Sequence, residues 1–301
     1  MQVGFIGLGA MGLPMTRHLL TAGHDVNVAS RSRAPIDAAV AAGAREAKGP
    51  HGVVDASEVT FLCVPSSGDV VGVLDEAQDA LGTGKIVVDT STIDPDVERA
   101  QHDRVNATGA RYLEAPLSGG TVGAENGTLT LMVGGDAQTL AEVRPLLEAF
   151  ARVIVHVGGP GSGQVVKLVN NLIYAAQMLA TAEGTVMAQR AGVDPALLHE
   201  VLVHSTGDCT AVRTRLPVEG VLADSPASNG WAPGFMTDLM AKDLDLAIAY
   251  AARQRTPLWT SGIVRQMLGA ASLAGYGRED FSSLAKVVRN LAGLADEGTT
   301  T

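Results

Sequence analysis

The stretch Val3-Gly4-Phe5-Ile6-Gly7-Leu8-Gly9-Ala10-Met11-Gly12 decides the fold. It opens with a short apolar run, and apolar residues at helical spacing then follow over positions 11–20 until Gly23 ends the pattern. This predicts a strand, a glycine turn and a helix. Three glycines at this spacing let the backbone approach a pyrophosphate, whose charge the N–H groups of the helix N-terminus stabilise. We therefore expect a dinucleotide to bind at Gly7, Leu8, Gly9, Ala10, Met11 and Gly12.

The glycine spacing alone is a weak signal. The chain contains 35 glycines, so matches to G-x-G-x-x-G arise by chance, and the alternative interpretation is an ordinary tight turn between a strand and a helix. The position of the motif directly after the first predicted strand favours the nucleotide.

Strand-like and helical patterns alternate through the first half of the chain. This alternation is typical of an α/β fold with a parallel, doubly wound sheet, so we expect a Rossmann domain over residues 1–160. Further strands are predicted at residues 25–29, 59–64, 86–89, 112–115, 129–133 and 153–156, and an Ala-rich helix at 35–42.

The pattern changes at the turn cluster Gly158-Gly159-Pro160-Gly161-Ser162-Gly163. A long helical pattern without proline follows over residues 164–190, and it should join the two halves. Residues 205–235 are rich in Gly, Pro, Ser and Asp and are expected to form loops. We therefore predict an all-helical second domain over residues 161–301, with further helices at 196–203, 239–253 and 261–274.

The composition excludes several classes of protein. The 301 residues are 46% hydrophobic and 18% charged, which is typical of a folded protein with two domains. The net charge of −10 repels phosphate backbones, so no nucleic acid partner is expected. No apolar stretch reaches the ~20 residues of a membrane span, so no membrane partner is expected either.

The cysteines and histidines indicate neither disulfides nor a metal. Cys63 and Cys209 form no C-x-x-C pair, and the seven histidines lack the close spacing of a catalytic zinc site. The N-terminus shows no pattern of a signal peptide. We expect a cytoplasmic protein without a metal.

The segment Ala29-Ser30-Arg31-Ser32-Arg33 indicates which dinucleotide binds. NAD-binding domains often carry an acidic residue at the end of the second strand, where it binds the ribose 2′-hydroxyl. No carboxylate stands here, and an Arg can pair with a 2′-phosphate and stack on adenine. NADP is therefore favoured, with NAD possible and with contacts from Ser30, Arg31 and Ser32. The alternative for Arg31 and Arg33 is a solvated loop pair.

Two polar residues on the long predicted helix are candidates for the chemistry. Lys167 and Asn171 lie four residues apart and share one face, where a surface stripe is the ordinary alternative. Their neighbours are mostly apolar, which favours a buried cleft. A desolvated lysine has a lowered pKa, so Lys167 is a candidate general acid or base. The neighbours are Val165, Val166, Leu168, Val169, Leu172 and Ile173.

A glycine-rich turn follows the strand predicted near residue 115. In Leu117-Ser118-Gly119-Gly120-Thr121, a hydroxyl and successive N–H groups could cradle a carboxylate as a backbone nest. The alternative is an ordinary glycine turn. This turn predicts a small substrate that carries a carboxylate.

Four motifs in order and at similar spacing resemble those of the β-hydroxyacid dehydrogenases, over essentially the whole chain. They are GFIGLGAMGLPM, EAPLSGG, GSGQVVKLVNN and MAKDLDLA. The family includes 3-hydroxyisobutyrate dehydrogenases, tartronate semialdehyde reductases and short-chain semialdehyde reductases. The resemblance implies a Rossmann domain and a helical domain like the C-terminal domain of 6-phosphogluconate dehydrogenase.

The resemblance also implies roles for individual residues. Lys167 would donate or accept the proton, Asn171 would position the substrate, and Ser118, Gly119 and Gly120 would hold its carboxylate. Val64, Pro65 and Thr92 would line the nicotinamide, and Lys242 would contact the cofactor. The activity implied is hydride transfer between NAD(P)(H) and a small β-hydroxyacid or its semialdehyde.

Some features leave alternatives open. Glu114 and Leu117 stand where the family often has Asp and Val, and the loop Gly207-Asp208-Cys209-Thr210 lacks the usual Ser-rich pattern, so the substrate is not named by the sequence. The related imine reductases replace the catalytic lysine, which is intact here. An NADP-binding sensor without turnover is a further alternative. The apolar faces of the helical half indicate a homodimer or homotetramer.

Overall fold

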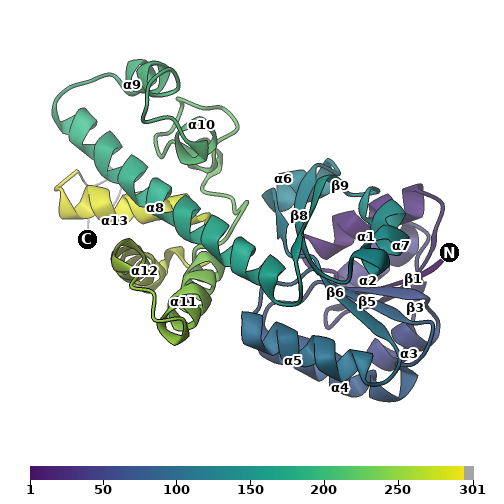
Figure 1. Cartoon of the computed structure of the whole chain (residues 1–301). Helices are drawn as coiled ribbons and strands as arrows, with labels where there is room; N and C mark the ends of the chain where they lie inside the picture. The colour runs from purple at the N-terminus through teal and green to yellow at the C-terminus, as the bar shows by residue number, and fades with distance from the viewer. Residues whose placement is uncertain (295–301) are drawn as a thin grey trace. The chain divides into compact units, whose positions relative to one another are not determined.

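The computed structural model describes residues 1–294, which form two compact units (Figure 1). Unit 1 spans Met1–Lys167, and unit 2 begins at Leu168. The long helix α8 (Ser162–Arg190) starts in unit 1 and continues into unit 2.

Unit 1 is built on one sheet, in the order β3-β2-β1-β4-β5-β6-β8-β7, with β9 paired to β8. The strands from β3 to β6 are parallel, as predicted, whereas β8 runs antiparallel to β6 and β7. The reversal arises because β7 and β8 pair across the short helix α6 (Gly120–Glu125). The strands are β1 (Gln2–Ile6), β2 (Asp25–Ala29), β3 (Arg45–Glu46), β4 (Val59–Leu62), β5 (Ile86–Asp89), β6 (Arg111–Glu114), β7 (Leu117–Ser118), β8 (Leu129–Gly135) and β9 (Ala151–Gly158).

Helices cover both faces of this sheet, because both faces of its inner strands are apolar. Successive side chains of a strand point to opposite faces, so Phe5 and Ile6 enter different hydrophobic clusters. The predicted doubly wound Rossmann architecture is confirmed. Besides α6, the helices are α1 (Gly12–Thr21), α2 (Arg33–Ala41), α3 (Gly49–Asp55), α4 (Ser67–Glu76), the 3₁₀ turn η1 (Gln78–Ala80), α5 (Pro95–Asn106) and α7 (Ala137–Leu147).

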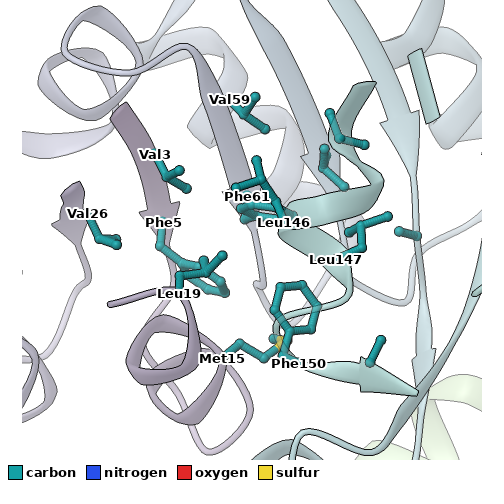
Figure 2. Packing of buried hydrophobic residues seen from close by; sticks show 14 of the residues in the cluster. Val3, Phe5, Met15, Leu19, Val26, Val59, Phe61, Leu146, Leu147 and Phe150 are labelled. Atoms are coloured by element: carbon teal, nitrogen blue, oxygen red, sulfur yellow. The ribbon is translucent and has the colours of Figure 1, made fainter. Parts of the chain in front are cut away.

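Three aromatic rings lie at the centre of one of these clusters (Figure 2). Phe5 of β1 stacks on Phe61 of β4 at 5.8 Å between ring centroids, and Phe61 meets the edge of Phe150 at 5.7 Å. All three are fully buried. Burial of such a side chain stabilises the fold by ~1.5–3 kcal/mol, which fixes β1 and therefore the turn that follows it.

The described elements of unit 2 are helical, as predicted. The region expected to be loops, 205–235, also contains a helical turn, α10, and the helix expected over 261–274 ends at Ala271 and continues as a π-helical turn. No helix within residues 1–294 is long and apolar enough to cross a bilayer. The elements are α9 (Pro195–Leu202), α10 (Thr210–Arg215), η2 (Pro226–Asn229), α11 (Thr237–Arg253), α12 (Trp259–Ala271), η3 (Ser272–Tyr276), η4 (Phe281–Ser283) and α13 (Leu284–Leu291).

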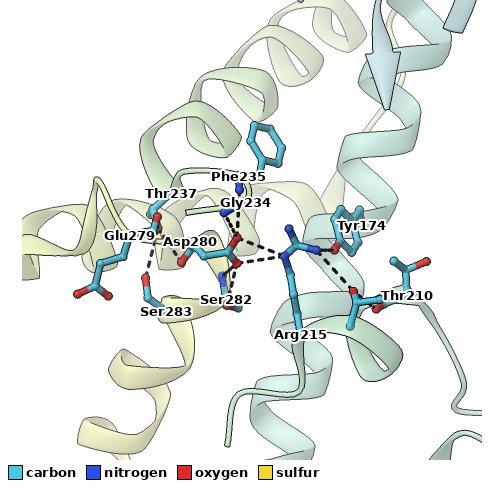
Figure 3. A network of polar contacts seen from close by, with 11 residues as sticks. Tyr174, Thr210, Arg215, Gly234, Phe235, Thr237, Glu279, Asp280, Ser282 and Ser283 are labelled. Atoms are coloured by element: carbon cyan, nitrogen blue, oxygen red, sulfur yellow. Dashed lines mark hydrogen bonds and ion pairs between the residues drawn. The ribbon is translucent and has the colours of Figure 1, made fainter. Parts of the chain in front are cut away.

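A buried ion pair organises the loops of unit 2 (Figure 3). Arg215, at the end of α10, donates to the carboxylate of Asp280 at 3.1 Å and to the hydroxyl of Tyr174 at 2.6 Å. Asp280 also accepts hydrogen bonds from the backbone N–H groups of Gly234 and Phe235. One carboxylate thereby ties together three segments that are distant in the sequence.

Candidate active site

The glycine turn after β1 has the shape that a dinucleotide requires. Gly7 has a φ of 97°, and a Cβ there would lie 2.2 Å from the carbonyl oxygen of Cys63. A Cβ on Gly12 would lie 2.0 Å from the carbonyl oxygen of Gly7, whereas a Cβ on Gly9 would meet no atom within 4 Å. The first and third glycines therefore allow close packing of the chain, and the second faces open space in which a ligand can approach the backbone.

Backbone hydrogen bonds hold this turn in place, and the first N–H groups of α1 are not used by them. Gly7 N donates to Ala29 O at 3.0 Å, and Leu13 N donates to Gly9 O at 3.1 Å, which begins the helical pattern of α1. The N–H groups of residues 10–12 precede this bond, so they point toward the space in front of the helix. The side chain of Leu8 is buried in the core, so only its backbone could contact a cofactor. The turn fits a dinucleotide.

Two arginines follow β2, and their partners differ. Arg33 contacts both Asp37 and Glu46, which occupies its guanidinium. Arg31 is 77% exposed and contacts one carboxylate, Asp69, at 2.9 Å. The hydroxyl of Ser30 accepts a hydrogen bond from Leu8 N, which links the end of β2 to the glycine turn.

The residues expected around the nicotinamide follow β4 and β5, next to the glycine turn. These strands are parallel neighbours of β1 in the order β1-β4-β5, so their carboxyl ends meet at one edge of the sheet. Val64 N donates to Ser91 Oγ at 3.0 Å, and Pro65 is exposed. Thr92 is half-buried. These three positions lie where Rossmann folds bind their ligands.

The turn Ser118-Gly119-Gly120 leads from β7 into α6. Gly119 and Gly120 have φ values of 135° and 61°, a conformation that favours glycine. Ser118 pairs with Thr130 of β8, which fixes the start of the turn to the sheet.

Lys167 and Asn171 are both buried on α8, with 7% and 2% of their surfaces exposed. Of the apolar residues around them, Val166, Val169 and Ile173 are 39%, 49% and 50% exposed, whereas Leu168 is buried. This stretch of α8 therefore buries two polar side chains while it exposes three apolar ones.

Asp243 of α11 holds the amide of Asn171. Asn171 Nδ2 donates to Asp243 Oδ2 at 2.6 Å, and Asn170 Nδ2 donates to Asn171 Oδ1 at 3.0 Å, so the orientation of the Asn171 amide is fixed. Lys242 Nζ lies 3.0 Å from the other oxygen of Asp243, which is 3% exposed. Sequence reasoning did not single out Asp243 as a site candidate, although it directly follows Lys242 in the sequence.

A group of buried carboxyls lies where α8 begins. Glu114 accepts hydrogen bonds from Gly163 N at 2.8 Å and Gln164 N at 3.3 Å, and Gln164 Nε2 donates to Glu98 at 3.1 Å. Burial raises the pKa of Glu114 to about 7, against its backbone hydrogen bonds. Burial, together with the charges of Asp89 and Glu114, raises the pKa of Glu98 well above its ordinary value. The N-terminus of the helix that carries Lys167 is thus fixed by side chains of β6 and α5.

Comparisons with known proteins decide the family. Residues 2–158 match the NAD-binding domain of 6-phosphogluconate dehydrogenase, and residues 161–288 match the NAD-binding region of NADP-dependent 3-hydroxyisobutyrate dehydrogenase. The NAD-dependent L-serine dehydrogenase of Pseudomonas aeruginosa is 39% identical, over 95% of this chain and 97% of that protein. The chain belongs to the β-hydroxyacid dehydrogenase family.

Solved structures agree. The 3-hydroxyisobutyrate dehydrogenase of Mycobacterium tuberculosis, solved with L-serine, has a TM-score of 0.90 at 35% identity and covers 96% of this chain and 99% of its own. Psf3, solved with NADP⁺ and 2-OPP, has a TM-score of 0.82 at 30% identity, over 95% of this chain and 99% of its own. An imine reductase at 24% identity shares the fold alone. The predicted family is confirmed, and this β-hydroxyacid dehydrogenase is an NAD(P)-dependent oxidoreductase that acts on a small hydroxyacid or its semialdehyde.

Proposed function

We propose that this β-hydroxyacid dehydrogenase prefers NADP and interconverts a small 3-hydroxy acid and its semialdehyde, with Lys167 as general acid and base. One observation carries the proposal: α8 buries Lys167 and Asn171, although three apolar residues of the same stretch are exposed. Desolvation of an ammonium and an amide costs free energy, so packing alone does not favour this arrangement. Such burial is typical of groups that act on a bound substrate.

Lys167 would move the proton that accompanies hydride transfer. The bound nicotinamide supplies the hydride for reduction or accepts it in oxidation. In reduction, the charged Nζ of Lys167 donates a proton to the carbonyl oxygen of the substrate, which becomes the hydroxyl. In oxidation, the neutral Nζ takes the proton of the hydroxyl. A positioned proton donor of this kind contributes ~10²–10⁴-fold to the rate.

Asn171 and the turn Ser118-Gly119-Gly120 would position the substrate. Asp243 fixes the Asn171 amide, which supports a role in orienting the substrate. The hydroxyl of Ser118 and the N–H groups of the turn would hold the carboxylate, because a chain with a net charge of −10 needs local donors for an anion. The relatives' named ligands, L-serine and 3-hydroxyisobutyrate, share a carboxylate and a hydroxyl on the third carbon.

The residues after β2 support the preference for NADP. The exposed guanidinium of Arg31 would pair with the 2′-phosphate of the cofactor, with Ser30 and Ser32 beside it. Val64, Pro65 and Thr92 would line the nicotinamide, and Lys242 is a further proposed contact with the cofactor.

We also propose a homodimer or homotetramer in the cytoplasm. Unit 2 exposes large apolar side chains on several helices, such as Met187, Trp259 and Ile263 at 72%, 84% and 62%, and such surfaces are typical of subunit interfaces. Both cysteines are free thiols, which fits a reducing compartment. Light scattering after size-exclusion chromatography would give the number of subunits.

The test is turnover of NADPH and NADH with a panel of small aldehydes: methylmalonate semialdehyde, tartronate semialdehyde, succinic semialdehyde and glyoxylate. We expect NADPH oxidation with at least one of the first two, and a higher kcat/KM with NADPH than with NADH. Binding of NADPH without any turnover would favour the sensor. Turnover only with cyclic imines would favour an imine reductase, and a clear preference for NADH would contradict the assignment of Arg31.

A further inference from the structure

The partner of Arg31 carries an inference about cofactor choice, which rests on the proposed role of Arg31 in NADP binding. Arg31 Nη1 lies 2.9 Å from Asp69 Oδ1, and the side chain of Asp69 is 25% exposed. Asp69 lies in the first turn of α4, after β4, whereas Arg31 follows β2. Because β1 lies between β2 and β4 in the sheet, the ion pair joins the loops on the two sides of the glycine turn.

The carboxylate of Asp69 is held in place by the cap of α4. Ser66 is the N-cap residue, and its Oγ accepts a hydrogen bond from Asp69 N at 3.2 Å. The same hydroxyl donates to Asp69 Oδ2 at 2.7 Å, which leaves Oδ1 directed to Arg31. Asp69 is therefore a fixed negative charge beside the guanidinium.

This arrangement affects the two cofactors differently. A 2′-phosphate bound to Arg31 must share the guanidinium with Asp69 and lie close to its carboxylate, so two negative charges repel each other. The 2′-hydroxyl of NAD carries no charge and suffers no such repulsion. We propose that Asp69 determines cofactor specificity by weakening the preference for NADP that Arg31 alone would give.

The test compares kcat/KM for NADPH and NADH in Asp69→Asn with the same aldehyde substrate. We expect the NADPH to NADH ratio to rise roughly tenfold at low salt, through a lower KM for NADPH, and the change to shrink at high ionic strength because salt screens exposed charges. Asp69→Glu keeps the charge and should leave the ratio close to that of the parent protein. An unchanged ratio in Asp69→Asn would overturn the proposal. A lower ratio would overturn it as well, because it would mean that Asp69 holds Arg31 in place for the phosphate.

Two further variants separate this inference from the proposed function. Asp75→Asn makes the same charge change on α4, but Asp75 pairs with Arg104 at 2.6 Å, so we expect no change in the ratio. Arg31→Ala should lower kcat/KM for NADPH more than for NADH. If Arg31→Ala behaves so and Asp69→Asn does not change the ratio, the NADP assignment stands and the role of Asp69 falls. If Arg31→Ala leaves the ratio unchanged, the NADP assignment falls and the role of Asp69 falls with it.

Discussion

The two units of this β-hydroxyacid dehydrogenase bury carboxyl groups in different ways. In unit 1, Asp89, Glu98 and Glu114 are buried near one another, with hydrogen bonds from backbone N–H groups, a tyrosine hydroxyl and an amide. In unit 2, the buried Asp280 faces the guanidinium of Arg215. Like charges that gather in a low dielectric favour protonated forms, whereas opposite charges keep each other ionised. The stability of unit 1 should therefore depend on pH, whereas the stability of unit 2 should depend on the pairing of Asp280 with Arg215.

The largest effect on the free energy of unfolding is expected from Arg215→Met. The arginine side chain is 16% exposed and that of Asp280 is fully buried, so the variant leaves a carboxylate buried without its cation. Breaking such a pair costs ~3–5 kcal/mol, and the backbone hydrogen bonds that Asp280 keeps place the loss near the lower end. Urea unfolding followed by tryptophan fluorescence measures this directly, because both tryptophans, Trp231 and Trp259, lie in unit 2.

Arg213 provides the matched control for that variant. It lies on the same short helix and pairs with Asp208 at the surface, where its side chain is 55% exposed. Arg213→Met should shift the fluorescence midpoint little. Equal shifts for the two arginines would contradict the claim that the buried pair organises unit 2.

A smaller effect, with a sign set by pH, is expected from Glu114→Gln. The folded-state pKa of Glu114 is raised to about 7, so its contribution to stability is fully present below its unfolded pKa and is lost as pH rises through about 7. The amide mimics the protonated acid and does not titrate. The Tm of the parent should thus fall relative to that of Glu114→Gln between pH 5 and pH 9, by an amount equivalent to on the order of 2 kcal/mol.

Glu142 is the control for this pH series. Its hydrogen bond from Arg111 lowers its pKa, so it stays ionised throughout the range from pH 5 to pH 9. The difference in Tm between the parent and Glu142→Gln should therefore be constant with pH. If the difference in Tm between the parent and Glu114→Gln is also constant with pH, the claim that Glu114 has a raised pKa in the folded protein is contradicted.

The sequence predicted most of the fold because burial on both faces leaves a readable pattern. Residues 86–88, for example, are apolar at three successive positions, and glycine-containing turns separate such runs from helices. The direction of β8 could not be predicted, because the sequence pattern of such a strand does not show whether it pairs in parallel or antiparallel with its neighbours. The helical turn α10 was missed because its residues, Thr210–Arg215, carry no clear apolar periodicity.

The candidate site was predictable only in part. The glycine turn, Arg31, Lys167 and Asn171 follow local rules of spacing and flanking residues. The partner of Asn171 stands 72 residues away, and Asp69 stands 38 residues from Arg31, so no local pattern joins these pairs. The folded chain is needed to bring such groups into contact.

The role of Lys167 is tested most directly by the kcat of Lys167→Ala with NADPH and the best semialdehyde of the panel. We expect a kcat lower by ~10²–10⁴-fold, the usual loss for a general acid or base, with the Kd for NADPH changed by less than about threefold in a fluorescence titration. A kcat near that of the parent, with the cofactor bound as before, would contradict the assignment of Lys167 as the group that moves the proton.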